Sequence, residues 1–143
     1  EKALPTIEGE VNDILAQMVD FGIVLEMDGK NINTYLAYDA DNVWPLELSS
    51  GMERFVSSLA MRVGLINVCN LPRANFLAID EGFGNMDGDN LNSVYMLFQY
   101  LKTQFQFVLI VSHIESMRDT VDSLLEITKE KGFSQIKLPS KFS

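Results

Sequence analysis

The spacing of apolar residues along the chain predicts an alternation of helices and strands. Residues 1–20 form a predicted helix that begins at Pro5 or Thr6, and Gly22 is the expected helix stop. Its apolar side chains recur at helical intervals and make one stripe: Ile7, Val11, Ile14, Leu15 and Met18. The stripe is typical of a core-facing helix and also of the end of a coiled coil, and its length does not decide between them.

Residues 23–48 show the pattern of antiparallel strands. Asp28-Gly29 is a hairpin signal between predicted strands at 23–27 and 32–38, and a second turn follows at 39–42. Residues 43–48 form a third short strand, in which Pro45 indicates an edge position or a bulge.

A second helix is predicted from Ser50 to about Asn70. Ser50 followed by Glu53 has the spacing of a capping box, which by itself indicates only a well-formed helix start. The same atoms also suit an anion, because the free amides and the dipole of a helix N-terminus point outward. The helix body carries apolar residues at core spacing, namely Phe55, Leu59, Val63 and Ile66.

Two apolar runs, at residues 76–79 and 105–111, predict strands buried on both faces of a parallel sheet. Residues 88–103 between them form a predicted helix with an apolar face made of Leu91, Val94, Tyr95, Phe98 and Leu101. Strand, helix and strand then make one right-handed βαβ unit.

Polar residues follow both of these strands. Asp80 and Glu81 end the first, and Ser112-His113 ends the second, so all lie at the edge where α/β sheets bind ligands. Asp80 suits Mg²⁺, and Glu81 suits a general base that polarises water. The plainer interpretation is that the acids cap a helix or line a polar turn and that His113 is a structural, hydrogen-bonded residue.

The last part of the chain is predicted as a short helix at 114–120 and a hairpin. Its strands are residues 123–129 and 133–138, joined around Glu130-Lys131-Gly132. Residues 139–143 are predicted to be frayed.

Composition limits the function. The 143 residues suit one globular α/β domain, and a net charge of −9 excludes broad binding of a phosphate backbone by this chain alone. The single cysteine, Cys69, rules out an internal disulfide, is expected to be buried, and fits a reducing compartment. No apolar run is long enough for a membrane span.

Three segments, in this order and spacing, resemble the second half of an ABC-type ATPase head. Residues 50–53 resemble the signature motif, residues 76–87 resemble Walker B and the D-loop, and residues 109–113 resemble the switch-histidine loop. The Asp-Glu-Gly-Phe-Gly sequence at 80–84, with Met86-Asp87, is similar to the SbcC-like DNA double-strand-break repair ATPases, relatives of the SMC chromosome proteins. The resemblance covers roughly residues 20–138.

The resemblance implies a role for each matching residue. Asp80 would hold the Mg²⁺ shell, Glu81 would polarise the hydrolytic water, and His113 would contact the γ-phosphate of ATP. Asn85 and Asp87 would belong to the D-loop. The signature residues Ser50, Gly51, Met52 and Glu53 would bind the nucleotide held by a second copy of the head. Met52 departs from the usual glycine, which leaves the role of that position open.

The resemblance also implies an architecture. The chain contains no G-x-x-x-x-G-K-[ST] phosphate-binding motif, so residues 21–143 would be the C-terminal lobe of the head. An N-terminal P-loop lobe would complete it, residues 1–20 would be a helix at the possible end of a coiled coil, and mostly parallel strands flanked by helices would make up the fold.

The implied function is ATP hydrolysis by a homodimer of heads that controls DNA end processing with a nuclease subunit. Double-stranded DNA would bind through the assembled complex, without a membrane, in the cytoplasm, nucleoid or nucleus. The alternatives are an SMC-type chromosome-organising head, a non-catalytic module on a degenerate ATPase scaffold, and an unrelated metal-dependent hydrolase that uses Asp80, Glu81 and His113.

Overall fold

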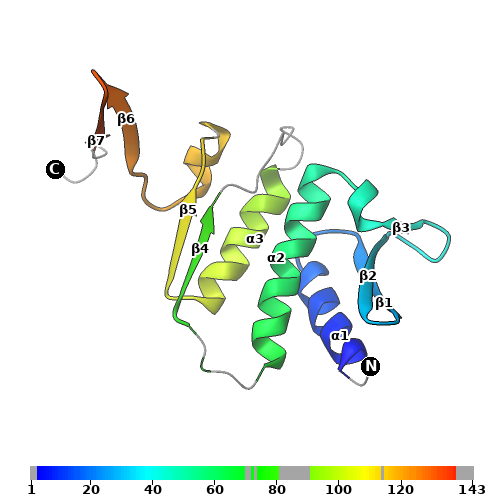
Figure 1. Cartoon of the computed structure of the whole chain (residues 1–143). Coiled ribbons are helices and arrows are strands. Elements are labelled where there is room, and N and C mark those ends of the chain that lie inside the picture. The colour runs from blue at the N-terminus through cyan, green and yellow to red at the C-terminus, as the bar shows by residue number, and fades with distance from the viewer. Residues whose placement is uncertain (1–2, 70–71, 73, 81–90, 114, 138–143) are drawn as a thin grey trace. The chain divides into compact units, whose positions relative to one another are not determined.

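The computed structural model describes all of the chain except residues 1–2, 70–71, 73, 81–90, 114 and 138–143 (Figure 1). It consists of two compact units, Glu1–His113 and Ile114–Ser143. The predicted α/β fold class is confirmed. The described elements are, in order, α1 (Leu4–Leu15), β1 (Gly22–Asp28), β2 (Asn31–Ala37), β3 (Val43–Pro45), η1 (Leu46–Leu48), α2 (Gly51–Val68), β4 (Phe76–Asp80), α3 (Leu91–Gln104), β5 (Phe107–Val111), η3 (Glu115–Thr120), β6 (Glu126–Glu130) and β7 (Phe133–Lys137).

Helix α1 buries the middle of the predicted stripe but is shorter than predicted, and Ile7 and Met18 at the ends of the stripe are only half-buried. Val11, Ile14 and Leu15 are fully or almost fully buried, and the helix ends at Leu15 rather than near Asp20. Gly22 is not the helix stop, because it opens β1. A Cβ at this position would lie 2.9 Å from the side-chain oxygen of Asn12, so the close approach of β1 to α1 explains the glycine.

Strands β1, β2 and β3 form an antiparallel sheet in that order. Asp28 pairs with Asn31, so the hairpin loop is Gly29-Lys30, one residue later than predicted. Gly29 has φ +61° and Lys30 does not have a positive φ, a combination that is typical of a type II′ turn. The third strand is shorter than predicted and lies at the sheet edge, as Pro45 indicated.

The segment after Pro45 turns into the 3-10 helix η1 instead of continuing as a strand. The amide and the hydroxyl of Ser49 both donate to the carbonyl of Leu46, at 3.1 and 2.6 Å, and close a tight turn. The turn ends directly before the first residues of α2.

Helix α2 packs against α1 (Figure 1). Its core face is rotated from the predicted one: Leu59 and Val63 are buried as predicted, but Phe55 and Ile66 are only half-buried. The other buried positions are Val56, Ser57, Ala60 and Gly64. Cys69, predicted to be buried, is exposed just beyond the helix end.

Strands β4 and β5 are parallel neighbours, paired from Phe76 with Phe107 to Asp80 with Val111. The predicted βαβ unit is therefore present, with α3 as its helix. Strand β5 begins later than predicted because Phe105 continues the bonding of α3, donating its amide to the carbonyl of Leu101 at 2.9 Å. The described core of α3 is Val94, Leu97, Phe98 and Leu101, whereas Tyr95, predicted on that face, is 44% exposed.

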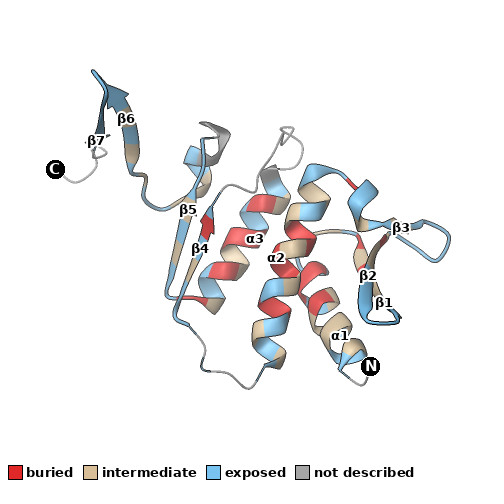
Figure 2. Ribbon diagram, viewed as in Figure 1, coloured by how far each residue is buried: buried red, intermediate tan, exposed pale blue. Residues whose placement is uncertain are grey.

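The prediction that these strands are buried on both faces is wrong for this chain. Ile79 is buried, but the side chains that point the other way are exposed and form what we call the open sheet face: Phe76, Ala78, Phe107, Leu109 and Val111. Figure 2 shows these strands mostly in the colour of exposed residues, while buried residues concentrate on the three helices. The helix α3 contacts β5 and covers one face of the pair only.

The second unit contains η3 and the predicted hairpin, with shorter strands than predicted. Lys131 and Gly132 form its loop with φ of 50° and 89°, and positive φ at both positions is typical of a type I′ turn. Arg118 pairs with Glu126 at 3.3 Å. The predicted frayed tail lies outside the described residues.

Candidate functional site

The carboxyl ends of β4 and β5 bring together two predicted site residues. Asp80 is the last residue of β4 and pairs with Val111, and His113 follows Val111 by two positions. Asp80 and His113 therefore lie at the same rim of the parallel pair, as predicted, and both are exposed. Glu81, Asn85 and Asp87 lie outside the described residues, so their roles stay predictions.

The start of α2 has the predicted capping box. The Ser50 hydroxyl accepts a hydrogen bond from the Glu53 amide at 3.3 Å, and the Glu53 carboxylate accepts one from the Ser50 amide at 2.6 Å. Ser50 and Gly51 are exposed and Met52 is half-buried. Ser50 and Gly51 thus lie at the surface of the described chain.

A third residue at this helix start was missed by sequence analysis. The Tyr38 hydroxyl donates to the second carboxylate oxygen of Glu53 at 2.7 Å. Partial burial, followed by this bond, raises the pKa of Tyr38 to about 12. Burial acts to raise the pKa of Glu53, but the hydrogen bonds from Tyr38 and Ser50 outweigh it and hold that pKa below its usual value. The carboxylate is therefore charged at neutral pH.

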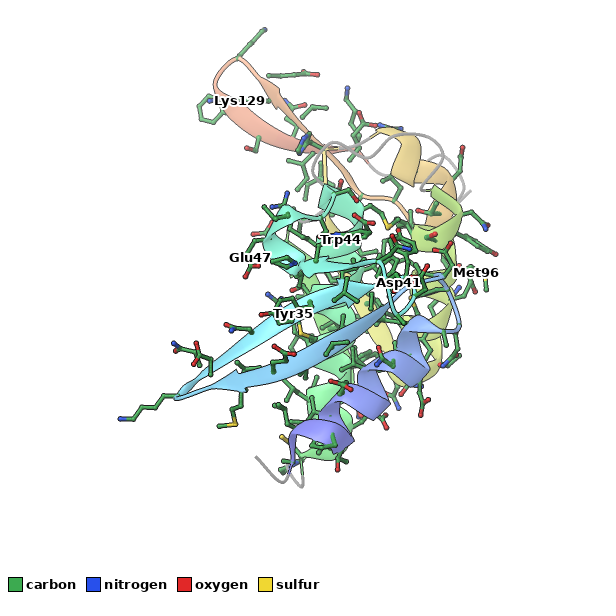
Figure 3. The ribbon with its side chains drawn as sticks, turned by 90° about the vertical axis from the view of Figure 1, so that its right-hand side faces the viewer. Tyr35, Asp41, Trp44, Glu47, Met96 and Lys129 are labelled. Carbon is green, nitrogen blue, oxygen red and sulfur yellow. The ribbon has the colours of Figure 1, made fainter. Side chains whose placement is uncertain are left out.

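Tyr38 belongs to a small aromatic cluster at one end of the antiparallel sheet, made of Phe21 just before β1, Tyr38 just after β2 and Trp44 on β3. Its ring lies 5.5 Å from Phe21 in a tilted arrangement and 5.5 Å from Trp44 in a stacked one. The backbone amide of Tyr38 donates to the Asn42 carbonyl at 3.1 Å. Figure 3 shows Trp44 on β3 and Tyr35 on the neighbouring strand β2. The cluster fixes the position from which Tyr38 reaches α2.

The residues at the rim fit Mg²⁺ in the way that nucleotide sites use it. In the described part of the chain, no three His, Cys, Asp or Glu side chains gather into a metal cage. Mg²⁺ in phosphate sites needs only one or two carboxylates, with phosphate oxygens and waters as the remaining ligands. Asp80, exposed at the end of a parallel strand, matches that requirement.

Comparison with known proteins places the chain in a family. No family model matches it. The uncharacterized protein R555 of Acanthamoeba polyphaga mimivirus is 34% identical over 149 residues, covering 93% of this chain and 11% of that protein. The SbcC component of the nuclease SbcCD of Deinococcus radiodurans is 31% identical over 100 residues, covering 69% of this chain and 11% of that protein.

The DNA double-strand break repair Rad50 ATPase of Pyrococcus abyssi is 24% identical over 143 residues, covering 98% of this chain and 16% of that protein. A solved structure from a study of ATP-driven dimerization and DNA-stimulated activation of SMC ATPases matches with a TM-score of 0.77 and 16% identity. The match covers 97% of this chain and 86% of that one. The chain is part of an SbcC- and SMC-like ABC ATPase head.

This SbcC- and SMC-like head segment corresponds to a small share of its curated relatives, between 11% and 16% of those named above. Within the described residues, none of its helices combines the length and apolarity that a membrane crossing needs.

Proposed function

We propose that this chain is the C-terminal lobe of an ATP-hydrolysing head that dimerises around ATP and controls DNA end processing together with a nuclease partner. The observation that carries the proposal is the register of β4 and β5, since it brings Asp80 and His113 to one rim. The names of the relatives, a component of a nuclease and a double-strand break repair ATPase, support the DNA-processing role.

Each site residue has a role in this proposal. Asp80 holds Mg²⁺, which when bound neutralises phosphate charge. Glu81 accepts a proton from the attacking water, and His113 contacts the γ-phosphate at the same rim. Asn85 and Asp87 communicate between the two heads.

The signature residues act on the nucleotide of the partner head. Ser50, Gly51, Met52 and Glu53 lie at the start of α2, where Ser50 and Gly51 are exposed. Met52 provides a backbone amide there in place of the usual glycine. A Ser50→Ala change in the full-length protein is therefore expected to abolish ATP-dependent dimerisation while ATP still binds.

The exposed apolar residues of the open sheet face are evidence that a second lobe packs there. Parallel sheets are covered on both faces in folded proteins, yet Phe76, Phe107 and Leu109 are 60%, 58% and 47% exposed here. The chain has no phosphate-cradling motif of its own. We infer that the lobe carrying the P-loop packs on this face and completes the head.

A matched pair of substitutions tests this packing in the full-length protein. Leu109 and Met27 are both strand residues and are 47% and 44% exposed. Leu109→Asp should lower the melting temperature by several degrees, because a charge would be buried under the second lobe, and Met27→Asp should have little effect. Equal, small effects from both changes would contradict a covering lobe.

An SMC-type chromosome-organising head is the second candidate, since the fold matches an SMC ATPase structure with a TM-score of 0.77. The purified full-length protein separates the two. Copurification with a nuclease, and ATP-dependent trimming of DNA ends, support the first function, whereas ATP-dependent bridging of intact DNA without end trimming supports the second.

A further inference from the structure

The first turn of α2 is joined to the antiparallel sheet through one side chain. The two carboxylate oxygens of Glu53 accept separate hydrogen bonds, one from the Tyr38 hydroxyl at 2.7 Å and one from the Ser50 amide at 2.6 Å. The carboxylate is thereby pinned beside the backbone of the cap, and its orientation depends on Tyr38.

This arrangement determines what the Ser50 hydroxyl can do. Its oxygen accepts from the Glu53 amide at 3.3 Å, and no residue in the described part of the chain accepts its proton. A hydroxyl that already accepts keeps its proton for donation, and a phosphate oxygen is an acceptor. Without the hydrogen bond from Tyr38, the Glu53 carboxylate could rotate and accept a hydrogen bond from the Ser50 hydroxyl. The hydroxyl would then no longer be available to a phosphate, and the negative charge of the carboxylate would lie in front of the helix start.

The tyrosine itself is held from three sides. Its ring contacts Phe21 and Trp44, and its amide bonds to the Asn42 carbonyl. The sheet therefore sets where the hydroxyl lies, and the hydroxyl sets where the Glu53 carboxylate lies.

We propose that Tyr38 is a positioning residue for the signature helix: it holds the Glu53 carboxylate against the Ser50 amide, so that the Ser50 hydroxyl stays available as a donor to a phosphate of the partner-bound nucleotide. This inference rests on the proposed function, because it assumes that Ser50 contacts the nucleotide. It adds a residue outside the signature motif, contributed by the antiparallel sheet.

The test uses Tyr38→Phe in the full-length protein, with Tyr35→Phe as its matched control. Tyr35 lies on β2, three residues before Tyr38, and its hydroxyl makes no hydrogen bond within the described residues. Without nucleotide, Tyr38→Phe should speed hydrogen exchange in peptides that cover residues 50–53. With ATP, it should raise the protein concentration needed for dimerisation about ten- to a hundredfold, as expected for one hydrogen bond to a charged group. Tyr35→Phe should change neither quantity.

A double-mutant cycle separates positioning from a general effect on folding. In a Glu53→Ala background, Tyr38→Phe should change dimerisation by less than about twofold, because the group through which it acts is gone. An equal loss in both backgrounds would mean that Tyr38 does not act through Glu53 and would overturn the inference. Unchanged hydrogen exchange in Tyr38→Phe would overturn it as well.

Ser50→Ala identifies which proposal has failed. If Tyr38→Phe dimerises with ATP like wild type while Ser50→Ala does not, the positioning role is wrong and the nucleotide contact stands. If both variants dimerise like wild type, the contact of Ser50 with nucleotide is wrong, and the inference falls with it.

Discussion

Asn12 bonds to both backbone groups of Ile23, donating its amide to the carbonyl at 3.0 Å and accepting from the N–H at 2.8 Å. Within the described residues β1 lies at the edge of its sheet, so these groups have no neighbouring strand there to pair with. Glu8 acts similarly one pleat further on, accepting from the Leu25 amide at 2.7 Å. Polar side chains of α1 thus complete the edge of the sheet and tie the first helix to it.

Replacing Asn12 by leucine should destabilise the protein by about 1 to 3 kcal/mol, because the N–H and the carbonyl of Ile23 would lose the side chain to which they are hydrogen-bonded. The neighbouring Asp13→Ala change, at an exposed position of the same helix, is the control and should have little effect. Thermal or denaturant unfolding measures both. Equal stability of the Asn12 variant and wild type would show that water replaces these bonds without cost.

Two glycines make a matched test of the packing between α1 and α2. A Cβ at Gly64 would lie 2.8 Å from a methyl carbon of Val11, whereas a Cβ at Gly9 would meet nothing within 4 Å. Gly9→Ala should stabilise the protein by about 0.5 to 1 kcal/mol through helix propensity. Gly64→Ala should destabilise it despite the same gain, because the two helices must move apart. Stabilisation by both changes would contradict the close approach.

The Tyr38 hydroxyl should make stability depend on pH in the alkaline range. Partial burial, then the hydrogen bond to Glu53, raises its pKa from 10.0 to about 12. The folded protein therefore binds this proton more tightly than the unfolded chain. The contribution to stability is complete below pH 10.0 and is lost as pH rises toward about 12. The stability difference between wild type and Tyr38→Phe should shrink over this range in denaturant titrations, and a constant difference would argue against the bond.

Sequence patterns correctly predicted the features that are determined by residues close to one another in the chain. The capping box follows from Ser50 and Glu53 alone, and the shared rim of Asp80 and His113 follows from two apolar runs joined by a helix. Both predictions are confirmed, because cap geometry and the direction of parallel strands are set within short stretches of chain.

The remaining features depend on contacts between distant segments. Tyr38 meets Glu53 only because the sheet returns the chain to the start of α2. Gly22 was predicted as a helix stop, but the space it provides is for Asn12. The apolar run at 76–79 indicated a strand buried on both faces, whereas the described chain covers only one of them. The periodicity of the run reports only its apolarity, so it cannot show whether the described chain covers one face of the strand or both.

The most direct test of the account is turnover by the full-length protein with Glu81→Gln. The amide keeps the size of the side chain but cannot accept the proton of water, so ATP hydrolysis should fall by about two orders of magnitude or more. ATP should still bind, and the dimer should accumulate in size-exclusion chromatography with ATP and Mg²⁺ and fall apart when the metal is chelated. Wild-type turnover by this variant, or failure of ATP to produce any dimer, would contradict the account.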